Sequence, residues 1–176
     1  MEQDLRIPIG QFEAPAEIST ALLKQYISQI EATPENLKLA VAGLSDEQLD
    51  TAYRPGGWTV RQLVHHIPDS HLNCYVRFHW TLTEDQPQIK AYDEKGWAEL
   101  PYQQKVPIQT SLDLLTSLHA RWVILLKQLT EADLDRSFIH PDDGKHYPLR
   151  LAVALYAWHG NHHVAHITAL RKRMGW

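Results

Sequence analysis

Histidine is concentrated in two short segments of this 176-residue chain. Neutral imidazole is the commonest side-chain ligand for transition metals, so a histidine cluster can indicate a metal site. The two segments are far apart in the sequence, and a shared site requires a fold that brings them together. Seven of the eleven histidines belong to them: His65, His66 and His71 to the first, and His159, His162, His163 and His166 to the second.

The second segment has the spacing of a helix that carries its histidines inward. At about 100° per residue, His159, His163 and His166 fall within about 60° of one another, in an apolar stripe with Leu155 and Leu170. Two histidines four residues apart bind zinc in HExxH helices, but the glutamate that serves as base there is absent here. A buried polar group without a partner costs about 1–3 kcal/mol. The inward pair therefore predicts a shared metal ion or a hydrogen-bonded network in the core.

The first segment places His66 on a polar helical face, shared with Thr59, Gln62, Asp69, Ser70, Asn73 and Arg77. Opposite a helix that presents histidines, this face would form one wall of a polar pocket. We expect His65 and His71 to point outward or to contact a metal ligand rather than the metal. The remaining histidines are expected to be ordinary core or surface residues: His79, His119, His140 and His146.

Four segments with helical periodicity must position these side chains. Thr33-Pro34 is typical of a helix start, so the first helix is expected to resume or kink there and to run on to Gly43. Pro68 should kink the second helix just after His66. The predicted helices cover residues 18–32, 58–84, 111–129 and 148–173.

The four helices and the absence of a strong strand pattern predict an all-α fold, a four-helix bundle in a single domain spanning residues 1–176. Residues 1–15 are expected to form an extended arm, and residues 85–107 a loop. A tight turn or small hairpin is expected over 138–147, before the last helix.

Composition excludes several classes of partner. The net charge of −4 gives no electrostatic reason to expect nucleic acid or an anionic membrane. No apolar run approaches the ~20 residues of a membrane span, and the first residues lack the basic and apolar regions of a signal peptide. The single cysteine, Cys74, permits no internal disulfide. These features predict a cytoplasmic protein.

The two histidine segments together resemble the DinB superfamily. One carries Arg54-Pro-Gly-Gly-Trp58, followed by a histidine eight residues after the tryptophan and an aspartate three further on, which are His66 and Asp69. The other carries a His-x-x-x-His pair on the last helix. The likeness extends from Pro8 to the final Arg-Met-Gly-Trp and is closest to the YfiT-like group of metal-dependent hydrolases or bacillithiol transferases.

The resemblance implies an up-down-down-up bundle and often a homodimer. It also implies that His66, His159 and His163 bind one divalent metal per chain, zinc in the first place or nickel. Pro68 departs from the family pattern, which bears on the angle at which His66 is presented.

Three histidine ligands leave a coordination position open, as in catalytic zinc sites. We expect an enzyme that activates a low-molecular-weight thiol of the bacillithiol type for S-transfer to an electrophile. The alternative is a hydrolase that uses metal-bound water on a small molecule. A second alternative is a non-catalytic metal-binding stress protein, with His166 or Asp69 closing the coordination sphere. A di-iron carboxylate bundle is disfavoured because the chain contains no Glu-x-x-His.

The sequence also predicts where the substrate binds. Arg77 lies on the polar face of His66 and could pair with a carboxylate of an anionic thiol, unless it forms a surface salt bridge. Asn73 and His166 are further candidates for substrate contacts.

Overall fold

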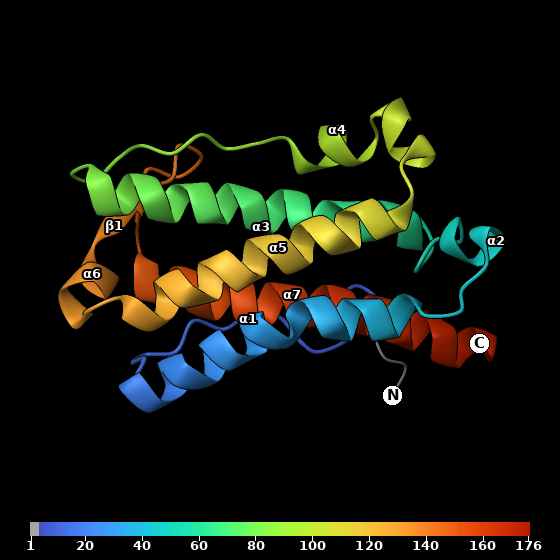
Figure 1. Ribbon diagram of the computed structural model, residues 1–176, viewed down its shortest axis with the longest axis horizontal. Coiled ribbons are helices and arrows are strands. Elements are labelled where there is room, and N and C mark those ends of the chain that lie inside the picture. The colour runs from blue at the N-terminus through green and yellow to red at the C-terminus, as the bar shows by residue number, and fades with distance from the viewer. Residues whose placement is uncertain (1–3) are drawn as a thin grey trace.

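The computed structural model describes residues 4–176, and four long helices run the length of the molecule (Figure 1). They are α1 (Thr20–Val41), α3 (Val60–Thr83), α5 (Ile108–Gln128) and α7 (Leu149–Met174). Following the colours in Figure 1, α3 and α5 run in one direction, whereas α1 and α7 run in the opposite direction. The predicted up-down-down-up four-helix bundle is confirmed. Residues 1–3 of the predicted arm lie outside the described residues.

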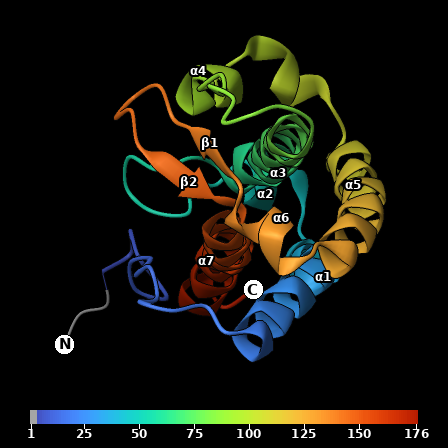
Figure 2. The ribbon, with the colours of Figure 1, turned by 90° about the vertical axis from the view of Figure 1, so that its left-hand side faces the viewer.

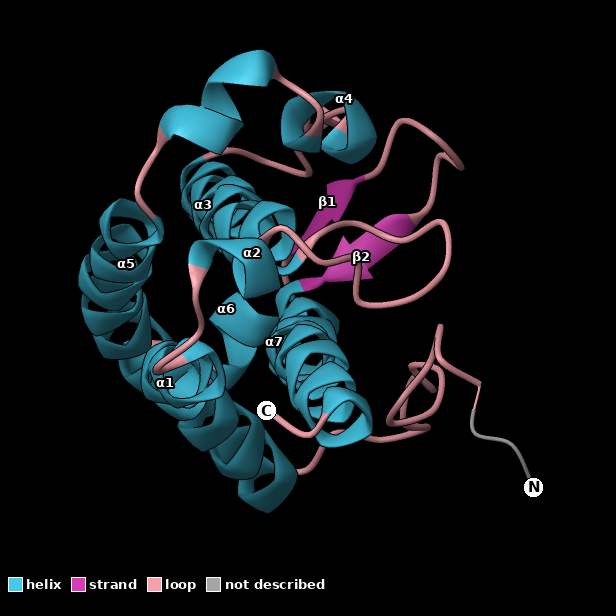
Figure 3. Cartoon of the chain, turned by 90° about the vertical axis from the view of Figure 1, so that its right-hand side faces the viewer, coloured by secondary structure: helices cyan, strands magenta, loops and turns pink. Residues whose placement is uncertain are grey.

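The helices surround a common centre in the order α1, α7, α3, α5, as the view along the bundle shows (Figure 2). The short elements lie between or outside them: α2 (Asp46–Leu49), α4 (Glu94–Ala98), the 3₁₀ turn Pro101–Lys105, α6 (Glu131–Asp135), β1 (Ser137–Ile139) and β2 (His146–Pro148). The strands form the predicted hairpin before the last helix, with Phe138 opposite Tyr147, and it lies outside the bundle (Figure 3).

Local residues mark the starts of the two helices that carry the histidine segments and the end of α7. Thr59 caps α3 in a reciprocal capping box with Gln62. Pro148 precedes α7, and Gly175 ends it with φ of 72°, a conformation that glycine adopts without strain. Both boundaries agree with the sequence analysis.

The prediction that the first helix restarts or kinks at Thr33-Pro34 needs correction. Residues 20–41 form one helix with Pro34 inside it. The Thr33 hydroxyl donates a hydrogen bond to the Gln29 carbonyl at 2.9 Å. Packing against α5 and α7 holds the helix together, although proline supplies no N–H to the carbonyl four residues earlier, that of Ile30.

The connection over residues 85–107, predicted to be a loop, contains α4 and the 3₁₀ turn and covers α3. Gln62 donates a side-chain hydrogen bond to the Ala98 carbonyl at 3.0 Å, and Gln103 donates one to Asp69 at 3.4 Å. The following helix begins at Ile108 rather than near Ser111. The connection therefore buries a face of α3 that an isolated bundle would leave in solvent.

Two apolar clusters fill the core, one towards each end of the bundle. The first includes Ile30, Phe78 and Trp122, and the second includes Leu63 and Leu115. Most of the buried histidines lie between the two clusters along α3, α5 and α7. The core thus contains a polar layer built largely from imidazole. No helix of the described residues is long and apolar enough to span a membrane.

Candidate metal centre

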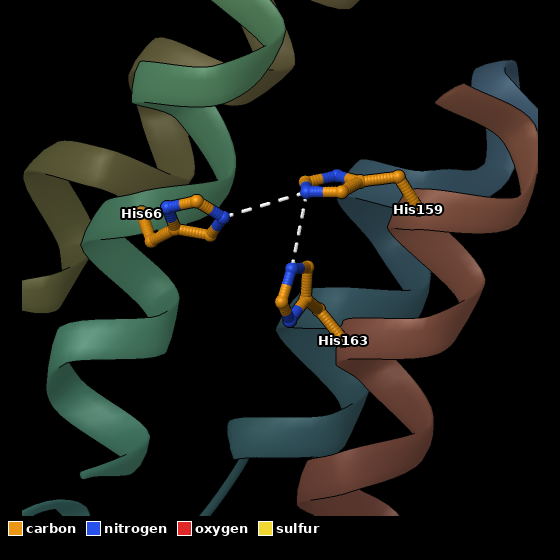
Figure 4. A group of neighbouring side chains, drawn as sticks. All are labelled: His66, His159 and His163. Carbon is orange, nitrogen blue, oxygen red and sulfur yellow. Dashed lines mark hydrogen bonds between the residues drawn. The ribbon is translucent and has the colours of Figure 1, made fainter. Parts of the chain in front are cut away.

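Three histidines from two helices converge within the polar layer (Figure 4). His66 comes from α3, and His159 and His163 come from successive turns of α7. The Nε2 atom of His159 lies 3.4 Å from His66 Nε2 and 3.1 Å from His163 Nε2. One nitrogen of each ring lies within 4.8 Å of those of the other two. The fold therefore brings the distant segments together as the sequence analysis expected.

Neighbouring residues hold these rings in place. Trp58 directly precedes Thr59, the capping residue of α3. Its ring centroid lies 4.7 Å from that of His66. On α7, Gly160 faces Thr33 of α1 so closely that a Cβ atom at Gly160 would lie 2.8 Å from the Thr33 side chain. The absence of a side chain at Gly160 thus lets α7 approach α1 beside His159.

Burial keeps the three imidazoles neutral. Desolvation lowers the pKa of His66 to about 4. Desolvation, and then the neighbouring histidines, lower the pKa of His159 and His163 well below the usual value. Each neutral ring has one nitrogen with a free lone pair, which is the form that binds a metal.

The donor set fits a divalent ion of intermediate softness. Imidazole suits zinc and nickel, and three such donors with no carboxylate match the set predicted from the sequence. The Nδ1 atom of His163 is buried and has no hydrogen-bond partner among the described residues. Among residues 4–176 the converging group contains only these three side chains, so neither His166 nor Asp69 closes it.

A cavity of about 720 Å³ opens onto the three histidines. Its walls come from the turn before α3, from α3 and α7, and from the covering connection. Arg54 and Lys95 bring positive charge to it, and Glu94 and Glu99 bring negative charge. The three histidines are therefore reachable from outside the bundle. The other residues that line this cavity are Tyr53, Gly56, Gly57, Trp58, Gln62, Trp158 and His162.

A second cavity, of about 560 Å³, is lined by His159 and Arg77. Only 9% of Arg77 is exposed, and its Nε atom has no hydrogen-bond partner in the described chain. Three carboxylates also line this cavity, yet none forms an ion pair with Arg77. The alternative of a surface salt bridge is therefore wrong, because Arg77 is buried and forms no ion pair among the described residues.

The other two predicted substrate residues lie away from both cavities. The Asn73 amide donates a hydrogen bond to the Asp69 carbonyl at 2.9 Å, within its own helix. His166 is buried one turn beyond His162, with 3.0 Å between their Nε2 atoms, and its ring centroid lies 4.1 Å from that of Tyr53.

Of the two positions expected for His65 and His71, the outward one is wrong, and contact with a predicted metal ligand is confirmed for His71. His65 and His71 are buried rather than outward, because α5 and the covering connection enclose more of α3 than the sequence indicated. His65 Nδ1 lies 2.7 Å from Ser111 Oγ. His71 Nε2 lies 3.1 Å from His159 Nδ1, and so His71 does contact a predicted ligand.

His119, expected to be an ordinary core or surface residue, contacts His71. Its Nε2 atom lies 2.8 Å from His71 Nδ1, and burial lowers its pKa to about 4. The signal was its position on the apolar stripe of α5, between Leu115 and Trp122, which predicts an inward side chain.

The chain matches known proteins over nearly its whole length. The family model of the DinB superfamily matches residues 29–167. A protein of Bacillus mycoides (strain KBAB4) named "Putative metal-dependent hydrolase" is 52% identical over 174 residues, which is 99% of both chains. A protein of the same name from Bacillus cereus (strain AH820) is 53% identical over 173 residues, 98% of this chain and 99% of the relative.

Solved structures agree with the observed fold. YfiT from Bacillus subtilis, described as "a probable metal-dependent hydrolase with an unusual four-helix bundle topology", matches with a TM-score of 0.96 and 48% identity, over 98% of this chain and 99% of that one. A mycothiol-dependent maleylpyruvate isomerase shares the fold at a TM-score of 0.60 and 14% identity, over 80% of this chain and 60% of that one. With a matching family model, near-complete coverage by close relatives and the same bundle topology, this chain belongs to the DinB superfamily.

Proposed function

We propose that this protein is a metal-dependent enzyme that transfers a low-molecular-weight thiol to an electrophile. In this proposal His66, His159 and His163 hold one divalent ion, with zinc as the first candidate. The observation that carries it is the position of His159, which lies in the walls of both cavities. Two cavities that meet at one ligand suit a reaction with two substrates.

A divalent ion bound there would supply Lewis acidity, which lowers the pKa of a thiol or of water. The three neutral rings contribute their lone pairs and no charge, so the positive charge of the ion stays available to an anionic reactant. Cys74 does not provide the nucleophile, because it is fully buried and burial raises the pKa of its thiol. The sulfur that reacts must therefore come from a substrate.

Arg77 is the proposed anchor for that substrate. A buried guanidinium without a counter-ion is costly, and a carboxylate that enters the second cavity would supply the missing partner. The planar guanidinium can bind a carboxylate through two parallel hydrogen bonds. This supports an anionic thiol of the bacillithiol type, held with its carboxylate at Arg77 and its sulfur towards His159.

Hydrolysis of a small molecule is the second candidate, and the names of the relatives at 52% and 53% identity favour it. It needs the same three histidines and the first cavity but no thiol. Dependence on thiol therefore separates the two candidates.

The test uses metal-loaded protein, an uncharged alkyl halide, and either an anionic thiol that carries a carboxylate or an uncharged thiol. In the reaction a carbon–sulfur bond forms, the carbon–halogen bond breaks, halide leaves and the thiol proton passes to solvent. We expect enzymatic turnover with the anionic thiol, and its loss in His163→Ala but not in His79→Ala, which changes an exposed histidine of α3. If the protein hydrolyses an ester without thiol and does not turn over the alkyl halide with thiol, the hydrolase replaces the transferase. Bound metal with neither activity would favour the non-catalytic alternative.

A further inference from the structure

A line of three histidines, the half-buried His159 and the buried His71 and His119, connects the candidate metal centre to the backbone of α1. His159 Nδ1 lies 3.1 Å from His71 Nε2, and His71 Nδ1 lies 2.8 Å from His119 Nε2. At the far end, His119 Nδ1 lies 2.6 Å from the carbonyl oxygen of Ile30. Each ring thus uses one nitrogen towards the centre and the other towards α1.

The Ile30 carbonyl determines which nitrogen donates and which accepts in each hydrogen bond of this line. A carbonyl oxygen can only accept a hydrogen bond, so His119 Nδ1 must carry a proton. His71 and His119 are buried, at 0% and 2% exposure, without a carboxylate partner in the described chain, and such rings are neutral. A neutral imidazole carries one N–H, so His119 Nε2 accepts from His71 Nδ1, and His71 Nε2 accepts from His159 Nδ1.

Pro34 explains why the Ile30 carbonyl is available. In an α-helix the N–H of residue 34 would bond to the carbonyl of residue 30, but proline has no N–H. The carbonyl therefore lacks its helical donor and receives the His119 N–H instead. Pro34, which was expected to interrupt the helix, thus leaves the Ile30 carbonyl as a fixed acceptor in the core.

We propose that His71 and His119 are positioning residues that fix the tautomer of His159. With its proton held on Nδ1, His159 presents the Nε2 lone pair to the point shared with His66 and His163. The consequence for metal affinity rests on the proposed metal site. The order of the protons does not rest on the metal site, because it follows from the Ile30 carbonyl and from the neutral state of the two buried rings.

Loss of His119 should act on the centre through His71. Without an acceptor at its Nδ1 atom, His71 can move its proton to Nε2, which then faces the N–H of His159. His159 must then lose this hydrogen bond or move its own proton from Nδ1 to Nε2. The Nε2 atom is the one whose lone pair the metal needs. Partners that orient metal-binding histidines typically contribute about 10–100-fold to metal affinity.

The first measurement is the nuclear magnetic resonance spectrum of the metal-free protein with ¹⁵N-labelled histidine rings. Long-range ¹H–¹⁵N correlations distinguish a protonated ring nitrogen from a free one. We expect the proton on Nδ1 in His71, His119 and His159. A proton on Nε2 of His71 or His159 would overturn the proposal, whether or not the protein binds metal.

The second measurement is zinc affinity, by competition with a chromophoric chelator, for folded variants. His71→Leu and His119→Leu should each weaken binding by about 10–100-fold. His71→Gln should stay close to wild type, because its side-chain oxygen can replace Nε2 as the acceptor for His159. Wild-type affinity in both leucine variants would overturn the proposal. If wild type itself binds no zinc, the proposed function fails, and the spectrum of the metal-free protein still decides the order of protons.

Discussion

His66 and His159 lie 93 positions apart in the chain, yet their Nε2 atoms are 3.4 Å apart in the bundle. Neither ring is charged, and each belongs to a helix whose start is set by its own local residues, Thr59 for α3 and Pro148 for α7. Two neutral imidazoles at this distance share a position at which a cation can satisfy both lone pairs.

Metal removal should destabilise the protein. Free metal at about 100 times its Kd stabilises the folded state by about 2.7 kcal/mol. For a domain of this size that corresponds to about 5–10 °C in Tm. Differential scanning calorimetry with and without chelator should show this decrease for wild type. In His66→Ala the chelator effect should be much smaller, and an equal decrease in both proteins would exclude His66 as a ligand.

Acid should destabilise the metal-free protein. The pKa values of His66 and His119 are lowered to about 4, so between pH 4 and the ordinary histidine pKa of about 6.5 the unfolded state binds more protons. Stability contributed by these neutral rings is complete above about pH 6.5 and is lost as the pH falls towards 4. The pKa of Asp69, raised by burial to about 6, acts in the opposite direction, but it is one group against several histidines.

Urea denaturation at a series of pH values checks this dependence. The free energy of unfolding should fall below about pH 6.5 in wild type. His119→Gln should make the fall less steep, whereas His79→Gln, which changes an exposed histidine, should leave it unchanged. A stability that is level from pH 7 to pH 5 would contradict the neutral, buried state of these rings.

Loss of the Arg77 guanidinium should weaken thiol binding without loss of metal. Arg77→Ala removes a buried charge that no described carboxylate pairs with, so we expect a higher KM for the anionic thiol. A charged hydrogen bond contributes about 1.5–3 kcal/mol, which corresponds to about 10–100-fold in KM. Arg77→Lys should restore the activity only in part, because lysine cannot form the paired contact.

The control for Arg77 is the uncharged thiol, whose KM should change little. Metal content, measured by mass spectrometry, should equal that of wild type in both variants. An unchanged KM for the anionic thiol in Arg77→Ala would remove the anchor from the proposal and keep the transferase.

Much of the site could be predicted because its signals are local. The spacing of His159 and His163 depends only on helix geometry, and Thr59 and Gln62 mark the start of the helix that carries His66. The fold class followed from four long periodic segments. The homodimer that the family resemblance implies remains a prediction.

Other features depend on packing between helices and could not be predicted in this way. His71 and His119 belong to different helices, and their hydrogen bond exists only because α3 and α5 lie side by side. Pro34 looks like a helix boundary in the sequence, and only the contacts of α1 with α5 and α7 show that the helix continues through it. Arg77 likewise lies beside residues of the covering connection and of α7, which are distant from it in the sequence.

The most direct test of the account is the metal content of the purified protein, measured by inductively coupled plasma mass spectrometry. The comparison is between wild type and the double variant His159→Ala/His163→Ala, with His79→Ala as control. We predict close to one divalent ion per chain in wild type and in the control, and almost none in the double variant, because two of the three converging donors are removed. Equal occupancy in wild type and the double variant would contradict the assignment of His66, His159 and His163 as the metal site.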